Sequence, residues 1–150
     1  MIARISTTLP CNTDDFWDII IKPNSLQYVT SPVIKFKPID HQSLESDWIP
    51  NKLYILQIYL FNIIPLGNHN IELKEIDRSK NIIKSEETGL LARVWNHTIT
   101  FSPSGKNEIH YVDEIEIQAG ILTPVIWTFA HLFYRHRQRR WKKLLADTMS

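Results

Sequence analysis

The stretch EIHYVDEIEIQAGILTPVIWTFAHLFYRHRQRRWKK, residues 108–143, contains an extended strand, a break and the start of a long helix. In its first part, inward and outward side chains alternate as they do along a β-strand. Gly120 ends the alternation, and Thr123 followed by Pro124 is typical of the N-cap and first turn of a helix. The side-chain spacing beyond Pro124 predicts a helix of roughly 20 residues or more.

The predicted helix has a polar and an apolar face, which indicates how it packs. The polar positions recur at helical spacing and mark a solvent stripe, namely Thr128, His131, Arg135, Gln138 and Lys142. The opposite face carries Ile126, Phe129, Phe133 and Leu144. We therefore expect the apolar face to lie on a sheet.

Strands are expected through most of the remaining chain. The pattern predicts them over residues 2–9, 33–39, 52–62, 68–77, 81–88, 93–102 and 108–119. Turn-like clusters separate them, so successive strands should form antiparallel hairpins, and residues 40–51 form the longest irregular connection. After the first strand, Asn12 or Thr13 caps a short helix, and Pro23 starts a second one that Pro32 ends. The expected fold is α+β, with a curved sheet of about seven strands wrapped around the long helix.

The bulk composition indicates an ordinary globular chain. A length of 150 residues and a hydrophobic fraction of 43% fit one domain, residues 1–150, that buries a sizeable core. No apolar run reaches the length of a membrane span, and the first residues do not resemble a secretion signal. The single cysteine, Cys11, cannot form an internal disulfide and is interpreted as a small, inert residue near the first helix. We expect a cytoplasmic protein.

The net charge of +1 conceals an uneven distribution. Six of the 17 basic residues lie between Arg135 and Lys143, so the rest of the chain is acidic. Cations are favoured near a helix C-terminus, which explains the cluster without a partner. An alternative is transient contact of Arg135, Arg139 and Lys142 with an anionic membrane surface. The short cluster and the acidic body argue against a nucleic-acid partner.

Several segments resemble a known superfamily. They are Thr8-Leu9-Pro10 leading into Phe16-Trp17, residues 59–67 (YLFNIIPLG), residues 111–127 (YVDEIEIQAGILTPVIW) and residues 133–143 (FYRHRQRRWKK). With the order of elements, they make the chain similar to uncharacterised bacterial members of the START-like or SRPBCC superfamily, the helix-grip, polyketide cyclase/dehydratase-like proteins. The resemblance implies a cavity between sheet and helix that holds a lipid, a polyketide or another hydrophobic molecule. The superfamily has no shared catalytic motif, although a minority of relatives are cyclases or dehydratases. We expect no cofactor.

The strand alternation points several polar side chains into the expected core. Asp113 faces inward, and a turn centred on Gly105 would pair it with inward-facing His97. A turn near Leu90 would likewise place Arg93 beside Glu87. Level with Asp113 on the returning helix lie His136, Arg137 and Arg140, of which His136 and Arg140 should project toward the sheet. We therefore predict an internal cluster of His97, Asp113, His136 and Arg140.

Such a cluster is open to several interpretations. The groups could satisfy one another around a wet cavity floor, since buried ion pairs are commonly structural. Tyr111 or Arg140 could instead orient a ligand oxygen. His97, oriented by Asp113, could act as a general base. A metal site of His97, Asp113 and His136 has no supporting ligand motif, and we expect no metal.

Aromatic side chains are the expected cavity wall, with Trp95, Tyr111, Phe129 and Phe133 as first choices and Tyr59 and Phe61 at the mouth. The leading hypothesis is a protein that binds or carries a hydrophobic small molecule, such as a lipid, a polyketide or an aromatic metabolite. One alternative is a cyclase, dehydratase or hydrolase that uses His97 and Asp113. Another is a non-catalytic interaction module with a basic helix end and a collapsed cavity.

Overall fold

A computed structural model describes residues 1–39, 44 and 46–149. Most of the connection predicted over residues 40–51 can be followed, but residues 40–43 and 45 lie outside the described part. The strands run over β1 Ile2–Leu9, β2 Ile34–Pro38, β3 Leu53–Leu60, β4 Ile64–Asp77, β5 Ile82–Gly89, β6 Val94–Gly105 and β7 Glu108–Gln118. They form one antiparallel sheet in the order β1-β7-β6-β5-β4-β3-β2. The predicted α+β architecture is confirmed.

The helices begin within a residue of the predicted positions, although Thr123, the predicted N-cap of the long helix, is already helical. In α1, Thr13–Ile20, the side chain of Asn12 accepts a hydrogen bond of 2.8 Å from the backbone N–H of Asp15. Helix α2, Pro23–Thr30, has proline in its first turn. A short 3-10 turn, η1 Gly120–Leu122, leads into α3, Thr123–Met149, which is 27 residues long. Gly120 takes a φ of 59° there, a conformation in which a Cβ would be strained.

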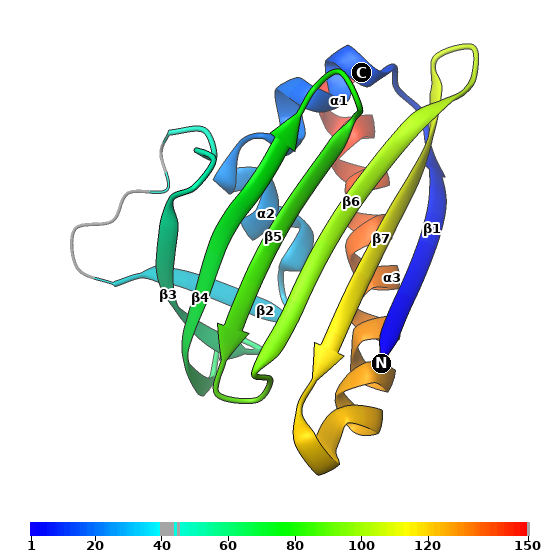
Figure 1. Ribbon diagram of the computed structural model, residues 1–150. Helices are drawn as coiled ribbons and strands as arrows, with labels where there is room; N and C mark the ends of the chain where they lie inside the picture. Colours follow the sequence, from blue (N-terminus) through cyan, green and yellow to red (C-terminus); the bar gives the residue numbers. More distant parts are fainter. Residues whose placement is uncertain (40–43, 45, 150) are drawn as a thin grey trace.

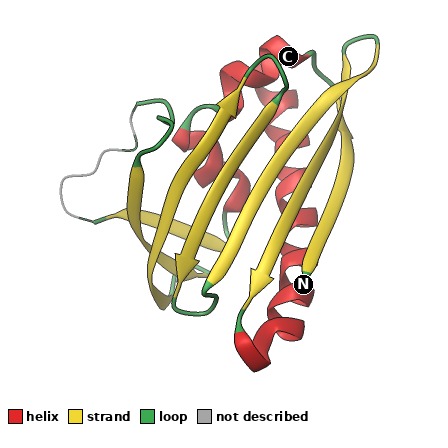
Figure 2. Cartoon of the chain, viewed as in Figure 1, coloured by secondary structure: helices red, strands yellow, loops and turns green. Residues whose placement is uncertain are grey.

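The sheet curves around α3, which crosses its concave face (Figure 1). Helix α3 contacts β1, β7 and α2, so the two short helices close one side of the space between α3 and the sheet. Figure 2 shows all three helices behind the same face of the sheet. Register shifts between Gln57 and Tyr59 in β3 and between Leu73 and Glu75 in β4 mark irregular pairing of the kind that bends a strand.

The core between sheet and helices is largely aromatic. The ring of Phe16 in α1 lies edge-to-face against Phe101, Tyr111 and Trp141, at centroid distances of 5.0, 5.6 and 5.2 Å. Each such contact adds roughly 0.5–1.5 kcal/mol to the gain from burial. A second cluster, around Ile115 and Ala130, packs the first half of α3 against β7. Together these clusters fix α3 along the sheet.

None of the helices in the described part is both long and apolar enough to cross a bilayer. The solvent stripe predicted for α3 is correct at Thr128, Arg135 and Lys142, which are exposed. It is wrong at Gln138, which is only 4% exposed and donates a hydrogen bond to the carbonyl of Ile5 at 2.9 Å. The helix is therefore rotated relative to the orientation that its polar spacing indicated.

Candidate ligand-binding cavity

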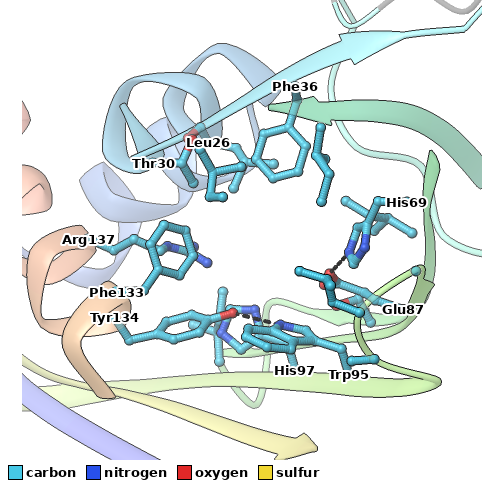
Figure 3. A pocket seen from close by; sticks show the side chains of 18 of the residues that line it. Leu26, Thr30, Phe36, His69, Glu87, Trp95, His97, Phe133, Tyr134 and Arg137 are labelled. Atoms are coloured by element: carbon cyan, nitrogen blue, oxygen red, sulfur yellow. Dashed lines mark hydrogen bonds and ion pairs between the residues drawn. The ribbon is translucent and has the colours of Figure 1, made fainter. Parts of the chain in front are cut away.

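A cavity of about 160 Å³ lies between the concave face of the sheet, α2 and α3. Its wall is mainly aliphatic and aromatic, and we call it the central cavity (Figure 3). The apolar lining includes Ile20, Leu26, Ile34, Phe36, Trp48, Ile58, Ile71, Leu73, Ile83, Ile99, Ile126, Phe129 and Phe133. Its polar lining consists of Thr30, His69, Ser85, Glu87, Trp95, His97, Tyr134, Arg137 and Trp141.

Asp113 is the centre of a hydrogen-bond network beneath the cavity. Its Oδ1 lies 2.8 Å from Nε2 of His97 and accepts a hydrogen bond from the hydroxyl of Tyr111 at 2.9 Å. Its Oδ2 accepts one from the amide of Gln138 at 3.0 Å. Asp113 is fully buried and His97 is 6% exposed. Because an ionised carboxylate can only accept, Nε2 of His97 carries the proton in this arrangement.

The surroundings keep Asp113 ionised. Burial alone would raise its pKa, but the hydrogen bond and electrostatic interaction with His97, followed by the positive charge of Arg137, outweigh burial and hold the pKa of Asp113 below its usual value. Burial and the neighbouring Asp113 raise the pKa of Tyr111 well above its ordinary range, so its phenol stays neutral and donates. The network is a charged acceptor surrounded by donors.

A second histidine–carboxylate pair faces the cavity from strands β4 and β5. Nε2 of His69 lies 2.7 Å from Oε2 of Glu87, and the hydroxyl of Ser85 donates to Oε1 of Glu87 at 2.6 Å. Burial would raise the pKa of Glu87, but its hydrogen bond and electrostatic interaction with His69, followed by the interactions with His97 and Ser85, lower that pKa. We expected Glu87 to face inward but did not identify His69. The signal was available, because His69 shares the inward alternation of Ile71 and Leu73.

Several predicted wall residues do line the cavity. Trp95, Phe129 and Phe133 are among the lining residues, and the rings of Phe129 and Phe133 stack at 5.5 Å. The indole N–H of Trp95 donates to the hydroxyl of Tyr134 at 3.1 Å. Tyr134 was not identified from the sequence. Burial raises the pKa of Tyr134, so it too is a neutral phenol.

Three predicted wall or mouth residues lie elsewhere. Tyr111 packs into the core against Phe16 and does not line the cavity. Tyr59 pairs with Lys35 on the outer face of the sheet, with the ammonium of Lys37 5.2 Å from its ring. Phe61 is 55% exposed in the turn after β3. The exposed lining residues that mark the mouth are Leu90 and Leu91, in the turn between β5 and β6.

The predicted polar cluster is wrong for its helical members. His136 bonds through Nε2 to the carbonyl of Ser31 at 2.8 Å, and Nε of Arg140 donates to the carbonyl of Tyr28 at 3.1 Å. Both side chains therefore secure α2 instead of entering the cavity. A helix turns by about 100° per residue, so a small error in its rotation exchanges one set of residues for the next. His97, Asp113 and His136, the set considered above as a metal site, are not brought together for the same reason.

The predicted Arg93–Glu87 contact is also wrong. Arg93 is exposed and lies with Asn70 and Thr88 on the outer side of the sheet. Strand β6 begins only at Val94, so the alternation that points Trp95 inward does not extend to Arg93.

Arg137 is the cation that the helix does place in the cavity. It is 5% exposed, and its guanidinium carbon lies 4.8 Å from the centre of the Tyr134 ring. It makes no hydrogen bond or ion pair with the described residues, and its Nε is buried without a partner. Burial would lower its pKa, but the electrostatic interactions with Tyr134, followed by Asp113, Tyr111 and Glu87, raise it. The guanidinium is therefore charged, with its donors unused.

The geometry can be set beside known proteins. Residues 7–145 match a family model described as Domain of unknown function (DUF8410). The chain belongs to the DUF8410 family. No curated protein sequence matches the DUF8410 chain significantly.

Solved structures with a similar fold span nearly the whole DUF8410 chain. A START superfamily protein from Mycobacterium smegmatis has a TM-score of 0.68 at 8% identity, with 98% of each chain covered. A conserved protein from Geobacillus kaustophilus has a TM-score of 0.71 at 12% identity, covering 99% of this chain and 97% of that chain. Norcoclaurine synthase from Thalictrum flavum, solved in complex with dopamine and hydroxybenzaldehyde, has a TM-score of 0.68 at 15% identity, covering 98% and 87%. The DUF8410 chain thus has the START-like helix-grip fold.

Proposed function

We propose that the DUF8410 chain binds a small, largely apolar molecule in the central cavity. The observation that carries the proposal is the cavity itself, an apolar enclosure with a few convergent polar groups, which is the usual composition of a ligand site. A packed interaction module would have filled this space with side chains. The START-like fold supports the same proposal, because it is generally associated with small-molecule binding.

The cavity volume indicates the size of the ligand. About 160 Å³ is close to the roughly 150 Å³ of an apolar protein cavity that accommodates benzene. This favours a molecule with one ring or a short branched chain over an extended lipid or polyketide. The norcoclaurine synthase of the same fold, solved with dopamine and hydroxybenzaldehyde, agrees with an aromatic ligand.

A second candidate function is catalysis at His97. The specific observation is that His97 lines the cavity while Asp113 holds its Nε2 at 2.8 Å, an arrangement that orients an imidazole for proton transfer. Incubation of the identified ligand with the protein, followed by mass spectrometry, separates the two functions. A change in ligand mass that disappears in His97→Gln would support catalysis, and an unaltered ligand would favour binding alone.

Membrane contact through the basic helix residues is not part of the proposal. Arg135, Arg139 and Lys142 are exposed, but they lie from the middle of α3 toward its C-terminus. The mouth is at Leu90 and Leu91, and Figure 1 shows that turn at the end of the molecule where α3 begins. Lys142 is roughly 28 Å along the helix axis from Thr123 at 1.5 Å per residue. These basic side chains therefore lie away from the mouth through which a ligand would enter.

Native mass spectrometry of the purified 17.6 kDa protein is the direct test. We expect a copurified apolar molecule at one per chain, identified after denaturing extraction. Ala92→Phe, which enlarges a buried lining residue, should lower the occupancy, whereas Ala146→Phe on the exposed side of α3 should not. A protein that is empty and also fails to take up added toluene would overturn the proposal.

A further inference from the structure

We propose that the ligand of the central cavity carries one acidic group, a carboxylate or a similar planar monoanion, that pairs with Arg137. This inference rests on the proposed binding function and names the chemical class of the ligand. It is carried by a guanidinium inside the protein, in the cavity wall, whose Nε is buried without a hydrogen-bond partner and which forms no ion pair with the described residues.

A buried guanidinium without a bonded partner is unusual. Arginine has five N–H donors, and burying donors unsatisfied costs free energy that a core rarely tolerates without a reason. Contact with the ring of Tyr134 at 4.8 Å compensates part of the charge but accepts no conventional hydrogen bond. Figure 3 shows Arg137 entering from α3, across the cavity from the His69–Glu87 pair. The N–H groups of its guanidinium are available to a molecule inside the cavity.

The acidic side chains around Arg137 are already engaged by other groups. Asp113 accepts hydrogen bonds from His97, Tyr111 and Gln138. Glu87 is bonded to His69 and Ser85. The negative charges of both carboxylates raise the pKa of Arg137, but neither carboxylate forms an ion pair with the guanidinium. The acceptor missing from the protein would be supplied by the ligand.

The donor set fits a carboxylate well. A guanidinium binds a carboxylate through two parallel N–H···O bonds, which fixes orientation and adds strength. The hydroxyl of Tyr134 accepts from Trp95, and its own proton has no acceptor among the described residues. Tyr134 also lines the cavity and is neutral, so it can donate to the same oxygen pair.

The charge balance favours one negative charge over two. Besides Arg137, the lining and the layer behind it contain two carboxylates, Glu87 and Asp113, each paired with a histidine. A phosphate monoester would bring a dianion into this field opposite a single guanidinium. A monoanion attached to an apolar body of about one ring satisfies both the donors and the cavity volume of about 160 Å³.

The test compares phenylacetate with phenylacetamide, which have nearly the same shape and differ in charge. Dissociation constants are measured by NMR titration for the wild type, Arg137→Met and Arg139→Met, with toluene as a neutral probe of the cavity. We expect the wild type to bind the acid about tenfold or more tightly than the amide, as for a charge-assisted pair. Arg137→Met should abolish the preference but retain toluene. Arg139→Met, which removes an exposed cation from the same helix, should leave the preference unchanged.

The outcomes separate this inference from the proposed function. Equal binding of acid and amide by the wild type, with toluene bound, would overturn the inference and leave the binding function standing. Failure of all three probes, with nothing copurified, would overturn both. Arg137→Lys keeps the charge and loses the planar fork, so it should show an intermediate preference and provides the comparison if Arg137→Met does not fold.

Discussion

His97 and Asp113 are joined by a 2.8 Å hydrogen bond although they stand two positions out of register on adjacent strands. His97 is opposite Ile115, and Asp113 is opposite Ile99, so the bond crosses the diagonal between neighbouring inward positions. The register also shifts between Pro103 and Gly105, near the turn. The contact predicted from the sequence is therefore present, but the pairing predicted for it is wrong.

Replacing Asp113 should destabilise the protein strongly. Asp113→Asn removes the charge that His97, Tyr111 and Gln138 all bind, and we expect the free energy of unfolding at pH 7 to fall by about 3 kcal/mol. Urea denaturation measures the change. Glu116→Gln, on the exposed face of the same strand, is the matched control and should change stability by less than about 0.5 kcal/mol. Equal effects of the two substitutions would contradict the central role given to Asp113.

The same carboxylate should make stability depend on pH on the acid side. The folded pKa of Asp113 lies below its unfolded value of about 3.9. Its contribution is therefore complete above that unfolded value and is lost as the pH falls through the folded pKa. The stability difference between wild type and Asp113→Asn should shrink when denaturation at pH 6 is repeated below about pH 3. A difference that stays constant would show that Asp113 is not ionised in the folded protein.

Gly89 should be required for the His69–Glu87 pair. A Cβ at residue 89 would lie 2.7 Å from Nδ1 of His69, too close for any real contact, so Gly89→Ala must displace the imidazole. We expect a loss of about 1–2 kcal/mol and a rise in the pKa of Glu87, because burial would no longer be opposed by His69. Urea denaturation and NMR titration of the carboxyl carbon give the two values. At Gly105 the added carbon would meet Glu108 at an ordinary 3.5 Å, so Gly105→Ala is the control.

Cys11 should be unreactive in the folded protein. Its side chain is fully buried, and burial, followed by the negative charge of Asp15, raises its pKa to about 11. Since the thiolate is the reacting species, a disulfide reagent at pH 8 should label no thiol in native protein and one thiol per chain in urea. Rapid labelling without denaturant would mean that α1 opens readily from the sheet.

The positions of the strands and helices were predicted better from the sequence than the rotation of α3 about its own axis. The alternation of residues 108–119 and the Thr123-Pro124 start were sufficient to place β7 and α3. The rotation of α3 was missed, because polar residues occupy nearly every position from 135 to 143 and the one apolar exception, Trp141, was not used to mark the inner face, although it is buried on the same side as Arg137 and Gln138. Contacts with α2 decide it, and they turn Arg137 and Gln138 inward where His136 and Arg140 were expected.

Because of this rotation, two arginines on the same helix should differ in how much they contribute to stability. Arg140 donates to the carbonyl of Tyr28 and lies 4.0 Å from its ring, so Arg140→Met should lower the free energy of unfolding by about 2 kcal/mol. Arg137 has no bonded partner in the described part of the chain, so Arg137→Met should leave the stability of empty protein within about 1 kcal/mol of wild type. Urea denaturation of both variants, stripped of copurified molecules, tests the contrast. A loss at Arg137 as large as that at Arg140 would mean that the guanidinium is structural, and the case for a ligand acid group would lose its physical basis.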